Sequence, residues 1–493
     1  MKRSFFEQVI LYDYRYLISY SLMILVGLYS LFWRLGSLVP GLSRYEADYI
    51  NSFGPGWDSI ASNPLFWPHK LLSQWSVSAF GNTELAWRLP SAALAALGLA
   101  AFFLIIRHRF QGRVAMVAIL LLATASWWLG AARLARPEIL IPVMMFLVVL
   151  AARQVYESQS PGRLAWLAWL VGTSLYVPLM PHVILIGGAV SYSIIRKHYA
   201  EASRRGYWLG YAILLALVIP LITAVIRDPA VGRELLVLPA DWPSFGQLLA
   251  SIKDSLMAIF WSAKEFTPLN LGTLPFLDLF TAAMVILGLY YLDHEISRSL
   301  TQFLLAGFIG LTIIMNLSPQ PGFNVVLIPF IYTLVAAGIV MLFAQWYEIF
   351  PRNPIARMVA FIPTVVLVLT VVWYHQTRYF VAWAKSPAIV QTFPPLSGAL
   401  EGYLRQVGPG QTAVALVGED EVPLARAAAW LYPRVQVTTV AAAAAGQPNL
   451  AISHQAYQAL DPETLELVDS LGLEQQNSPY QSYPVVLWYT SPQ

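Results

Sequence analysis

Two carboxylates lie close together in the segment Tyr45-Glu46-Ala47-Asp48-Tyr49, shortly after the first hydrophobic stretch of the chain. A carboxylate beside a membrane can take a proton from an acceptor hydroxyl, so Glu46 and Asp48 are candidate general bases. The alternative is that both are solvated acids in the first turn of a short helix, where the helix dipole favours negative charge. From the residues alone, we favour the second interpretation.

A second charged group, Arg133, Arg136 and Glu138, falls in one turn between two hydrophobic stretches. A guanidinium group binds phosphate through two parallel hydrogen bonds, which makes Arg136 a candidate phosphate ligand that Glu138 would orient. Arg133 and Arg88 are candidates of the same kind. The alternative for these arginines is that they extend toward lipid headgroups and anchor the ends of helices.

A third group lies in the first loop, where His69 and Lys70 follow a proline. The Lys70 ammonium would contact a phosphate as a point charge, and an exposed pair near headgroups is the alternative. His182 follows Pro181 at a helix break, where it would either support a site or bond to carbonyls that the proline leaves free. Glu84 is expected to support the site or to begin a helix.

The elements that position these groups are expected to lie in a membrane. The chain has 493 residues, of which 57% are hydrophobic and 12% charged, and its mean hydropathy is +0.58. Soluble domains carry about 25% charged residues. The chain contains no cysteine, which excludes disulfides and cysteine-bound metals. A net charge of +3 without long basic runs gives no indication of nucleic-acid binding.

Hydrophobic stretches predict about eleven membrane-spanning helices of about 20 residues each. The two stretches around Pro178 and Pro181 are short. The predicted spans are 17–35, 86–106, 114–132, 138–152, 164–180, 182–195, 207–226, 274–292, 299–316, 323–345 and 355–375.

The distribution of lysine and arginine predicts a cytoplasmic N-terminus, because more of these residues fall on the inner side although the outer loops are longer. The first span is expected to remain as an anchor, since no signal cleavage site follows it. Two long loops, 36–85 and 227–273, then lie outside, together with the C-terminus. Apolar residues at helical spacing predict an interfacial helix from Ser244 to Trp261.

Residues 380–493 alternate between predicted strands and predicted helices. This pattern predicts an extracytoplasmic α/β domain, separate from a transmembrane domain over 1–379. Its strands are expected at 411–418, 435–440, 450–453 and 485–489, with helices at 421–432 and 461–471. The first predicted strand is followed by Gly418-Glu419-Asp420-Glu421, which is acidic rather than glycine-rich. Nucleotide binding is therefore not expected.

The order of these motifs resembles a known family. An acidic motif after the first span is followed by Phe80-Gly81, Glu84, Ala86 and Arg88-Leu89-Pro90-Ser91, and then by Arg133 to Glu138. This pattern is similar to the GT-C membrane glycosyltransferases, within them to the protein O-mannosyltransferases and lipid A aminoarabinose transferases of family 39. The motifs cover about the first 200 residues, and the remainder resembles the family only in layout.

The resemblance implies an α-helical polytopic inner-membrane protein that transfers a sugar, with inversion, from a polyprenyl-phosphate donor at the outer face. It implies Glu46 or Asp48 as the base, Arg136, Lys70, Arg133 and Arg88 near the donor phosphate, and Glu84, Glu138, His69 and His182 in supporting positions. The partners implied are membrane lipid and the lipid-linked sugar. A divalent cation (Mg or Mn) would need several oxygen ligands, and Glu46 and Asp48 are the first candidates, with Glu138 a further one.

The sequence departs from the family at two places. Tyr45 stands where the family has an aspartate, and the turn 316–322 carries no charge where relatives often have a basic residue. A second hypothesis is therefore a catalytically inactive GT-C-like subunit of a membrane protein complex. A transporter is the third and less favoured hypothesis, because no inverted repeat is evident.

Overall fold

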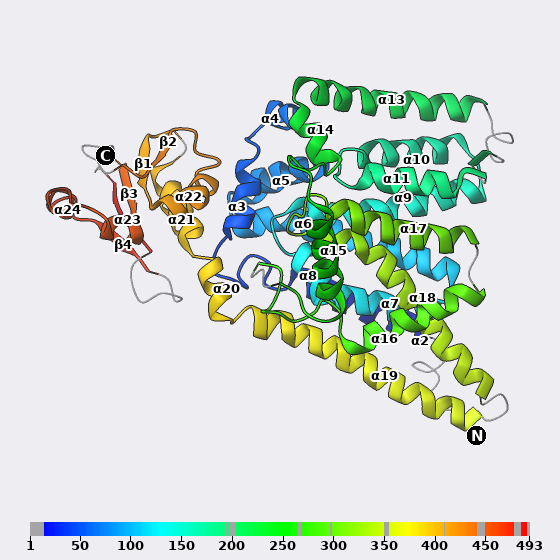
Figure 1. The fold of residues 1–493 in the computed structure, drawn as a ribbon. Coiled ribbons are helices and arrows are strands. Elements are labelled where there is room, and N and C mark those ends of the chain that lie inside the picture. The colour runs from blue at the N-terminus through cyan, green and yellow to red at the C-terminus, as the bar shows by residue number, and fades with distance from the viewer. Residues whose placement is uncertain are drawn as a thin grey trace.

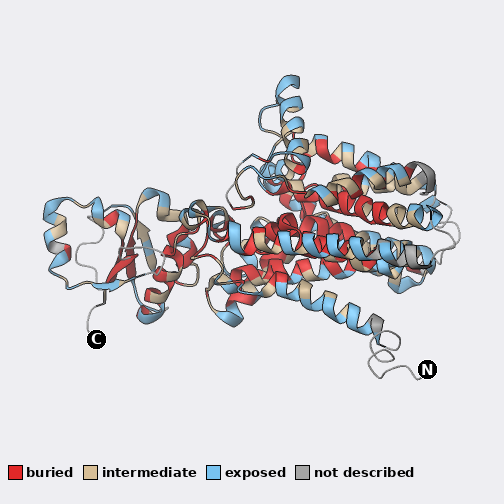
Figure 2. Ribbon diagram, turned by 90° about the horizontal axis from the view of Figure 1, so that it is seen from below, coloured by how far each residue is buried: buried red, intermediate tan, exposed pale blue. Residues whose placement is uncertain are grey.

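The computed structural model describes residues 14–193, 195–196, 204–264, 268–295, 298–349, 354–408, 410–440, 449–477 and 485–490. Most of the described chain forms a bundle of roughly aligned helices, and a small α/β unit follows it beyond one end of the bundle (Figure 1). Buried residues fill the interior of the bundle and, separately, the interior of the small unit (Figure 2).

Each predicted span coincides with one helix or with a pair of consecutive helices. The helices are α2 (Arg15–Phe32), α6 (Glu84–Arg109), α7 (Gly112–Thr124), α8 (Ser126–Ala132), α9 (Leu140–Glu157), α10 (Pro161–Ser174), α11 (Met180–Val190), α13 (Arg204–Arg227), α16 (Leu279–Glu295), α17 (Arg298–Met315), α18 (Ile328–Ile349) and α19 (Pro354–Thr377). Short 3-10 helices precede α9 and α18, namely η2 (Pro137–Ile139) and η3 (Phe323–Leu327).

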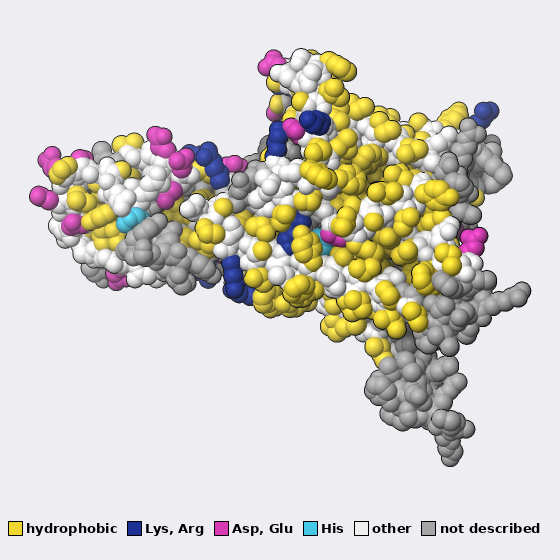
Figure 3. Space-filling view, turned by 60° about the horizontal axis from the view of Figure 1, so that its bottom comes forward, with side chains coloured by type: hydrophobic (Ala, Val, Ile, Leu, Met, Phe, Trp, Pro, Cys, Tyr) yellow, Lys and Arg dark blue, Asp and Glu magenta, His cyan; other side chains and the backbone are white. Residues whose placement is uncertain are grey.

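The number of membrane crossings is not fixed by these helices. Among the described residues, four segments are long and apolar enough to cross a bilayer, and one bent pair would make a fifth. The four are Glu84–Arg109, Pro137–Glu157, Gly206–Arg227 and Phe323–Ile349. The multi-pass character is therefore supported, whereas the count of eleven stays a prediction. Hydrophobic side chains cover much of the bundle surface, and most acidic side chains in that view lie on the C-terminal unit (Figure 3).

The predicted span 114–132 is broken. α7 ends at Thr124, α8 begins at Ser126, and the two helices meet at an angle of 60°. The backbone of Ala125 is extended, with φ −56° and ψ 129°, so the chain turns without a proline or a glycine at that residue. Because of this turn, α8 directs the following residues, Arg133 to Glu138, toward the first loop.

The two long loops contain short helices. The first loop forms α3 (Arg44–Asn51), α4 (Trp57–Ser62) and α5 (Trp67–Phe80), and the second forms α14 (Pro229–Leu235) and α15 (Phe245–Phe260). α15 matches the predicted interfacial helix. Phe245 is 80% exposed and neighbouring Trp242 and Trp261 are 70% and 75% exposed, as expected of side chains that contact lipid.

The chain leaves α19 through a π-helical turn, η4 (Arg378–Trp383), and continues as α20 (Pro387–Thr392) and α21 (Leu396–Val407). A five-stranded sheet of order β2-β1-β3-β5-β4 follows. Its elements are β1 (Ala413–Leu416), η5 (Glu419–Glu421), α22 (Val422–Ala428), β2 (Val435–Thr438), β3 (Asn449–Ser453), α23 (His454–Gln458), α24 (Pro462–Asp469), β4 (Glu474–Gln476) and β5 (Val486–Thr490).

The sheet has the alternating α/β pattern that the sequence predicts. β1 pairs in parallel with β2 and β3, with Ala413 opposite Val435 and Val414 opposite Leu450. β3 and β4 pair antiparallel with β5. The short edge strand β4 and the helix α23 were not predicted. The boundary at residue 380 stays a prediction.

The C-terminal unit packs against the first loop rather than standing apart from it. One hydrophobic cluster joins Ile50 and Trp87 to Tyr403, Leu424 and Trp488. Trp430 packs against this cluster through an edge-to-face contact with Trp87, with the two ring centroids 5.1 Å apart. This shared core holds the first loop over the end of the bundle, where the candidate site lies.

Candidate functional site

Glu46 begins the site as a helix-capping residue. Ser43 precedes α3, and its hydroxyl accepts a hydrogen bond from the Glu46 amide at 3.3 Å. In return, the Ser43 amide donates to Glu46 Oε2 at 2.9 Å. This reciprocal capping box needs serine and glutamate three residues apart, which the sequence provides.

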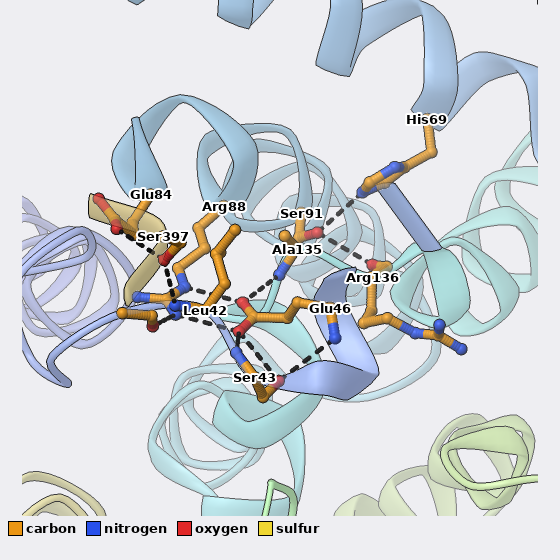
Figure 4. Close-up of polar contacts among 11 residues, drawn as sticks. Leu42, Ser43, Glu46, His69, Glu84, Arg88, Ser91, Ala135, Arg136 and Ser397 are labelled. Carbon is orange, nitrogen blue, oxygen red and sulfur yellow. Dashed lines mark hydrogen bonds and ion pairs between the residues drawn. The ribbon is translucent and has the colours of Figure 1, made fainter. Parts of the chain in front are cut away.

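The same carboxylate forms a buried ion pair with Arg88 of α6. Arg88 Nε donates to Glu46 Oε1 at 2.8 Å, and Arg88 Nη2 donates to Oε2 at 3.1 Å. The Ala135 amide donates to Oε1 at 2.9 Å. Arg88 also donates to the Gly41 carbonyl at 2.7 Å. Figure 4 shows these groups around the Glu46 carboxylate, with the Arg136 side chain directed away from it.

This arrangement does not favour Glu46 as a base or Arg88 as a phosphate ligand. Burial alone would raise the pKa of Glu46, but the charge and hydrogen bonds of Arg88, together with the Ser43 and Ala135 amides, lower it below its usual range. Both side chains are at most 1% exposed. The pair instead ties α3, α6 and the turn after α8 together.

Asp48 is not brought to the other charged groups. It is exposed on α3, close to Arg44 and Asn51, which contact the C-terminal unit. Arg44 lies 3.5 Å from Asp420, and Asn51 donates to the Pro423 carbonyl at 2.8 Å. Within the described part of the chain, no hydrogen bond or ion pair joins Asp48 to Arg136.

Arg133 is engaged by backbone carbonyls. Its guanidinium donates to the carbonyls of Ser30 and Leu31 at 2.8 Å and of Trp33 at 2.7 Å, where α2 ends. The group also lies 4.9 Å from the centre of the Phe380 ring. Cations at helix C-termini are stabilising, so the geometry assigns Arg133 to capping α2 rather than to a phosphate.

Arg136, Glu138 and Tyr45 form the second polar group. Arg136 forms an ion pair with Glu138, and its Nη1 donates to the Tyr45 carbonyl at 3.0 Å. The Tyr45 ring stacks on the guanidinium at 3.8 Å, and its hydroxyl lies 3.2 Å from Glu138 Oε1 and 2.8 Å from the Pro321 carbonyl. Tyr45 therefore bridges the α8–η2 turn and the uncharged turn that ends at Gly322.

His69 supports this group through a directed chain of hydrogen bonds. Ser91 Oγ donates to the Arg136 carbonyl at 3.0 Å, so it accepts from His69 Nε2 at 2.8 Å. His69 Nδ1 then accepts from the Tyr49 hydroxyl at 2.8 Å. Burial, with the nearby charges of Arg136 and Lys70, lowers the pKa of His69 to about 3. The imidazole is thus neutral and fixes the Arg136 backbone.

Lys70 is the predicted phosphate ligand whose charge is least engaged. Its side chain is buried, and Nζ donates to the Asn63 carbonyl at 2.7 Å. Within the described residues, no carboxylate lies within 4.0 Å of it. Burial lowers the pKa of Lys70 to about 8, and Glu234 of α14 opposes that shift. An ammonium group has three donors, so two remain for a ligand.

The remaining predicted residues lie outside this group. Glu84 is the first residue of α6, and the Ser397 hydroxyl donates to it at 3.3 Å. His182 is the third residue of α11, at the proline-containing start of that helix, and both interpretations of it stay predictions.

A divalent cation does not fit the residues predicted for it. Glu46 is saturated by Arg88 and amide donors, Asp48 is exposed on α3, and Glu138 is paired with Arg136. Across the described ranges, no group of three or more His, Asp or Glu side chains is placed to hold a metal ion. No step is therefore assigned to a cation.

Sequence reasoning missed three polar groups. Glu234 lies near Lys70, and the pKa of Glu234 is raised by partial burial. Asp278 lies 3.0 Å from His375 Nε2 and caps α16 through the Thr281 amide at 2.9 Å. The spacing of Asp278 and Thr281 is a helix-start signal that was available in the sequence. The third group, the contacts of the Tyr45 hydroxyl, joins residues too distant in the chain to be predicted.

Comparisons with known proteins concern the family profile and the fold. Residues 69–223 match the profile of a family described as dolichyl-phosphate-mannose-protein mannosyltransferase. The structure is similar to ArnT from Cupriavidus metallidurans in the apo state, with a TM-score of 0.55, 16% identity, and coverage of 97% of this chain and 100% of that chain. The same protein bound to undecaprenyl phosphate also gives a TM-score of 0.55 at 16% identity, with coverage of 98% and 100%.

A third similar structure is the Archaeoglobus fulgidus oligosaccharyltransferase, with a TM-score of 0.49, 14% identity, and coverage of 87% of this chain and 65% of that chain. Comparison with curated proteins finds no match. The likeness to ArnT establishes the fold, which is the GT-C membrane fold. The resemblance predicted from the sequence is thereby confirmed.

Proposed function

We propose that this protein transfers a sugar from a polyprenyl-phosphate donor at the membrane face that carries the first loop. The fold and the family match support glycosyl transfer in general. The observation that carries the donor class is Lys70, a buried ammonium with one backbone acceptor and no carboxylate at ion-pair distance in the described structure. Such a group gains most from an anionic ligand.

The donor phosphate would bind between Lys70 and Arg136. Lys70 supplies two further N–H donors, and Arg136 supplies a planar fork once it turns from Glu138. Because Lys70 is only 2% exposed, the phosphate reaches it when the segment around Asn63 or α14 moves aside. The apolar surface of the neighbouring helices would hold the polyprenyl chain.

We assign the base to Glu138 rather than to Glu46 or Asp48. In the free protein, Arg136 neutralises Glu138. A bound phosphate competes for Arg136, leaving Glu138 with the Tyr45 hydroxyl and with a carboxylate oxygen that can take the proton of the acceptor. Tyr45 occupies the position of the family's aspartate and positions Glu138, which lies 93 residues further along the chain.

The proposed chemical step is a direct displacement at the anomeric carbon of the donor sugar. The acceptor oxygen attacks the anomeric carbon, and its proton passes to Glu138. The bond from that carbon to the phosphate oxygen breaks, and polyprenyl phosphate leaves with the bonding electrons. Lys70 and Arg136 stabilise the negative charge that develops on the leaving phosphate. Attack opposite the leaving group inverts the anomeric configuration.

The role of Lys70 is tested by its removal. Purified protein is assayed for binding of undecaprenyl phosphate, with Lys70→Met compared with wild type and with Lys253→Met, an exposed lysine on α15. Loss of one charge-assisted contact should weaken binding roughly tenfold or more in Lys70→Met and leave Lys253→Met unchanged. Equal binding by all three proteins would remove Lys70 from the donor site.

A second candidate function is favoured by one specific observation. The Tyr45 side chain lies between Arg136, Glu138 and the Pro321 carbonyl, and it fills space that a smaller aspartate would leave open. If that arrangement is permanent, the protein is a catalytically inactive GT-C-like subunit of a membrane complex. Binding of undecaprenyl phosphate without any sugar transfer, together with a stable co-purifying membrane protein, would support this alternative.

A further inference from the structure

A cavity lies at the end of the bundle opposite the candidate site. Its volume is about 550 Å³, and it is lined by α2, the α6–α7 turn, α7, α16 and α18. α6 runs from Glu84 at the first loop to Arg109 at this cavity, 26 residues later. At about 1.5 Å per residue the helix is roughly 39 Å long, more than the bilayer core of about 30 Å. The cavity therefore faces the leaflet opposite the candidate site.

The lining of the cavity is amphipathic. Most of its wall is apolar, with Val114, Val117, Val340 and Phe343 among the contributing side chains. Two arginines, Arg109 and Arg113, lie at the same cavity, and its described lining contains no aspartate or glutamate. Both arginines are exposed, and among the described residues neither forms an ion pair.

The start of α7 adds to the positive field at this point. Gln111 precedes the helix, and its side chain makes no capping hydrogen bond. The first amides of a 13-residue helix thus lie beside Arg109 and Arg113 without a side-chain acceptor. The helix start alone would not define a site. Its coincidence with two arginines and an apolar cavity is what indicates a ligand.

We propose that this cavity binds an anionic phospholipid of the surrounding leaflet. The headgroup phosphate would contact Arg109 and Arg113, and an acyl chain would lie along the apolar wall. A basic pocket between helices at the membrane surface is a recognised setting for acidic lipid headgroups. A small soluble anion would leave the apolar wall unused, and a zwitterionic lipid would bring its own cation to a site that already holds two arginines.

The site is independent of the proposed sugar transfer, and its test needs no activity measurement. Native mass spectrometry of the full chain in detergent would compare retention of phosphatidylglycerol with that of phosphatidylcholine. We expect wild type to retain phosphatidylglycerol at least roughly tenfold better. The double variant Arg109→Gln/Arg113→Gln should lose this preference, whereas Arg107→Gln, an exposed arginine outside the lining, should keep it.

A second variant tests the apolar wall. Ala344 is exposed and lines the cavity, so Ala344→Trp should reduce phospholipid retention without removing charge. The proposal is overturned if wild type retains both lipids equally, or if Arg107→Gln loses the preference as fully as the double variant. It is also overturned if Ala344→Trp leaves retention unchanged, or if undecaprenyl phosphate displaces phosphatidylglycerol from wild type at equal concentration.

Discussion

At the residue scale, the charged side chains divide into two sets with different roles. Glu46, Arg88 and Arg133 are engaged by protein partners and hold elements together. Lys70, Arg136 and Glu138 form the proposed site: Lys70 has one hydrogen-bond acceptor, and the Arg136 side chain is 19% exposed whereas that of Arg88 is 1% exposed. The position of a residue in a sequence motif does not show to which set it belongs. That depends on which hydrogen-bonding groups of other segments lie next to it in the folded chain.

If Lys70 binds the donor phosphate as proposed, donor binding depends on pH. Its folded-state pKa of about 8 means that the ammonium is charged below that pH and neutral above it. Affinity for undecaprenyl phosphate should therefore fall as pH rises through about 8. Lys70→Arg should keep its charge and show no such fall, because an arginine stays protonated throughout this range. Parallel pH profiles for the two proteins, measured by equilibrium binding in detergent, would contradict the assignment.

At the element scale, the first loop is held by contacts that link distant segments. The capping box of α3 was predictable from Ser43 and Glu46 three residues apart, and the helical spans from hydrophobicity. The resemblance identified the position of Tyr45. The break at Ala125 and the pairing of Glu46 with Arg88 were not predictable, because no local signal marks the first and the second joins residues 42 positions apart.

The Glu46–Arg88 pair should behave as a structural ion pair. Because both groups are buried, Glu46→Gln or Arg88→Met alone leaves its partner unpaired, at a cost of about 3–5 kcal/mol. The double variant should be less destabilised than the sum of the two single variants. Thermal unfolding of the four proteins in detergent measures this coupling. Additive effects would show that the two residues act separately.

At the scale of the whole molecule, the C-terminal unit and the first loop share one hydrophobic core. Trp430 contacts Trp87 and donates to the Phe53 carbonyl at 2.9 Å, and Asn82 donates to the Ala428 carbonyl at 2.7 Å. The sheet unit thus packs against the first loop and positions α3 and, through it, Tyr45. This role was not predictable from the sequence, which indicated only a separate domain.

Removal of the Trp430 side chain should weaken the packing between the sheet unit and the first loop. Trp430→Ala leaves a gap beside Trp87 and Phe53 and should cost roughly 3 kcal/mol. Hydrogen exchange should then rise in residues 44–53 more than in α9, which lies in the bundle core. As a control, Trp166→Ala on the exposed surface of α10 should leave the exchange of 44–53 unchanged. An unchanged first loop in Trp430→Ala would show that the sheet unit does not hold it.

The most direct test of the account is sugar transfer by purified wild type, Glu138→Gln and Asp48→Asn. Each protein is given radiolabelled undecaprenyl-phosphate sugars and a membrane extract as acceptor, and the rate of label transfer is measured. We predict transfer by wild type, the same rate in Asp48→Asn, and a loss of about 10²–10⁴-fold in Glu138→Gln. Wild-type activity in Glu138→Gln, or its loss in Asp48→Asn, would contradict the assignment of Glu138 as the base.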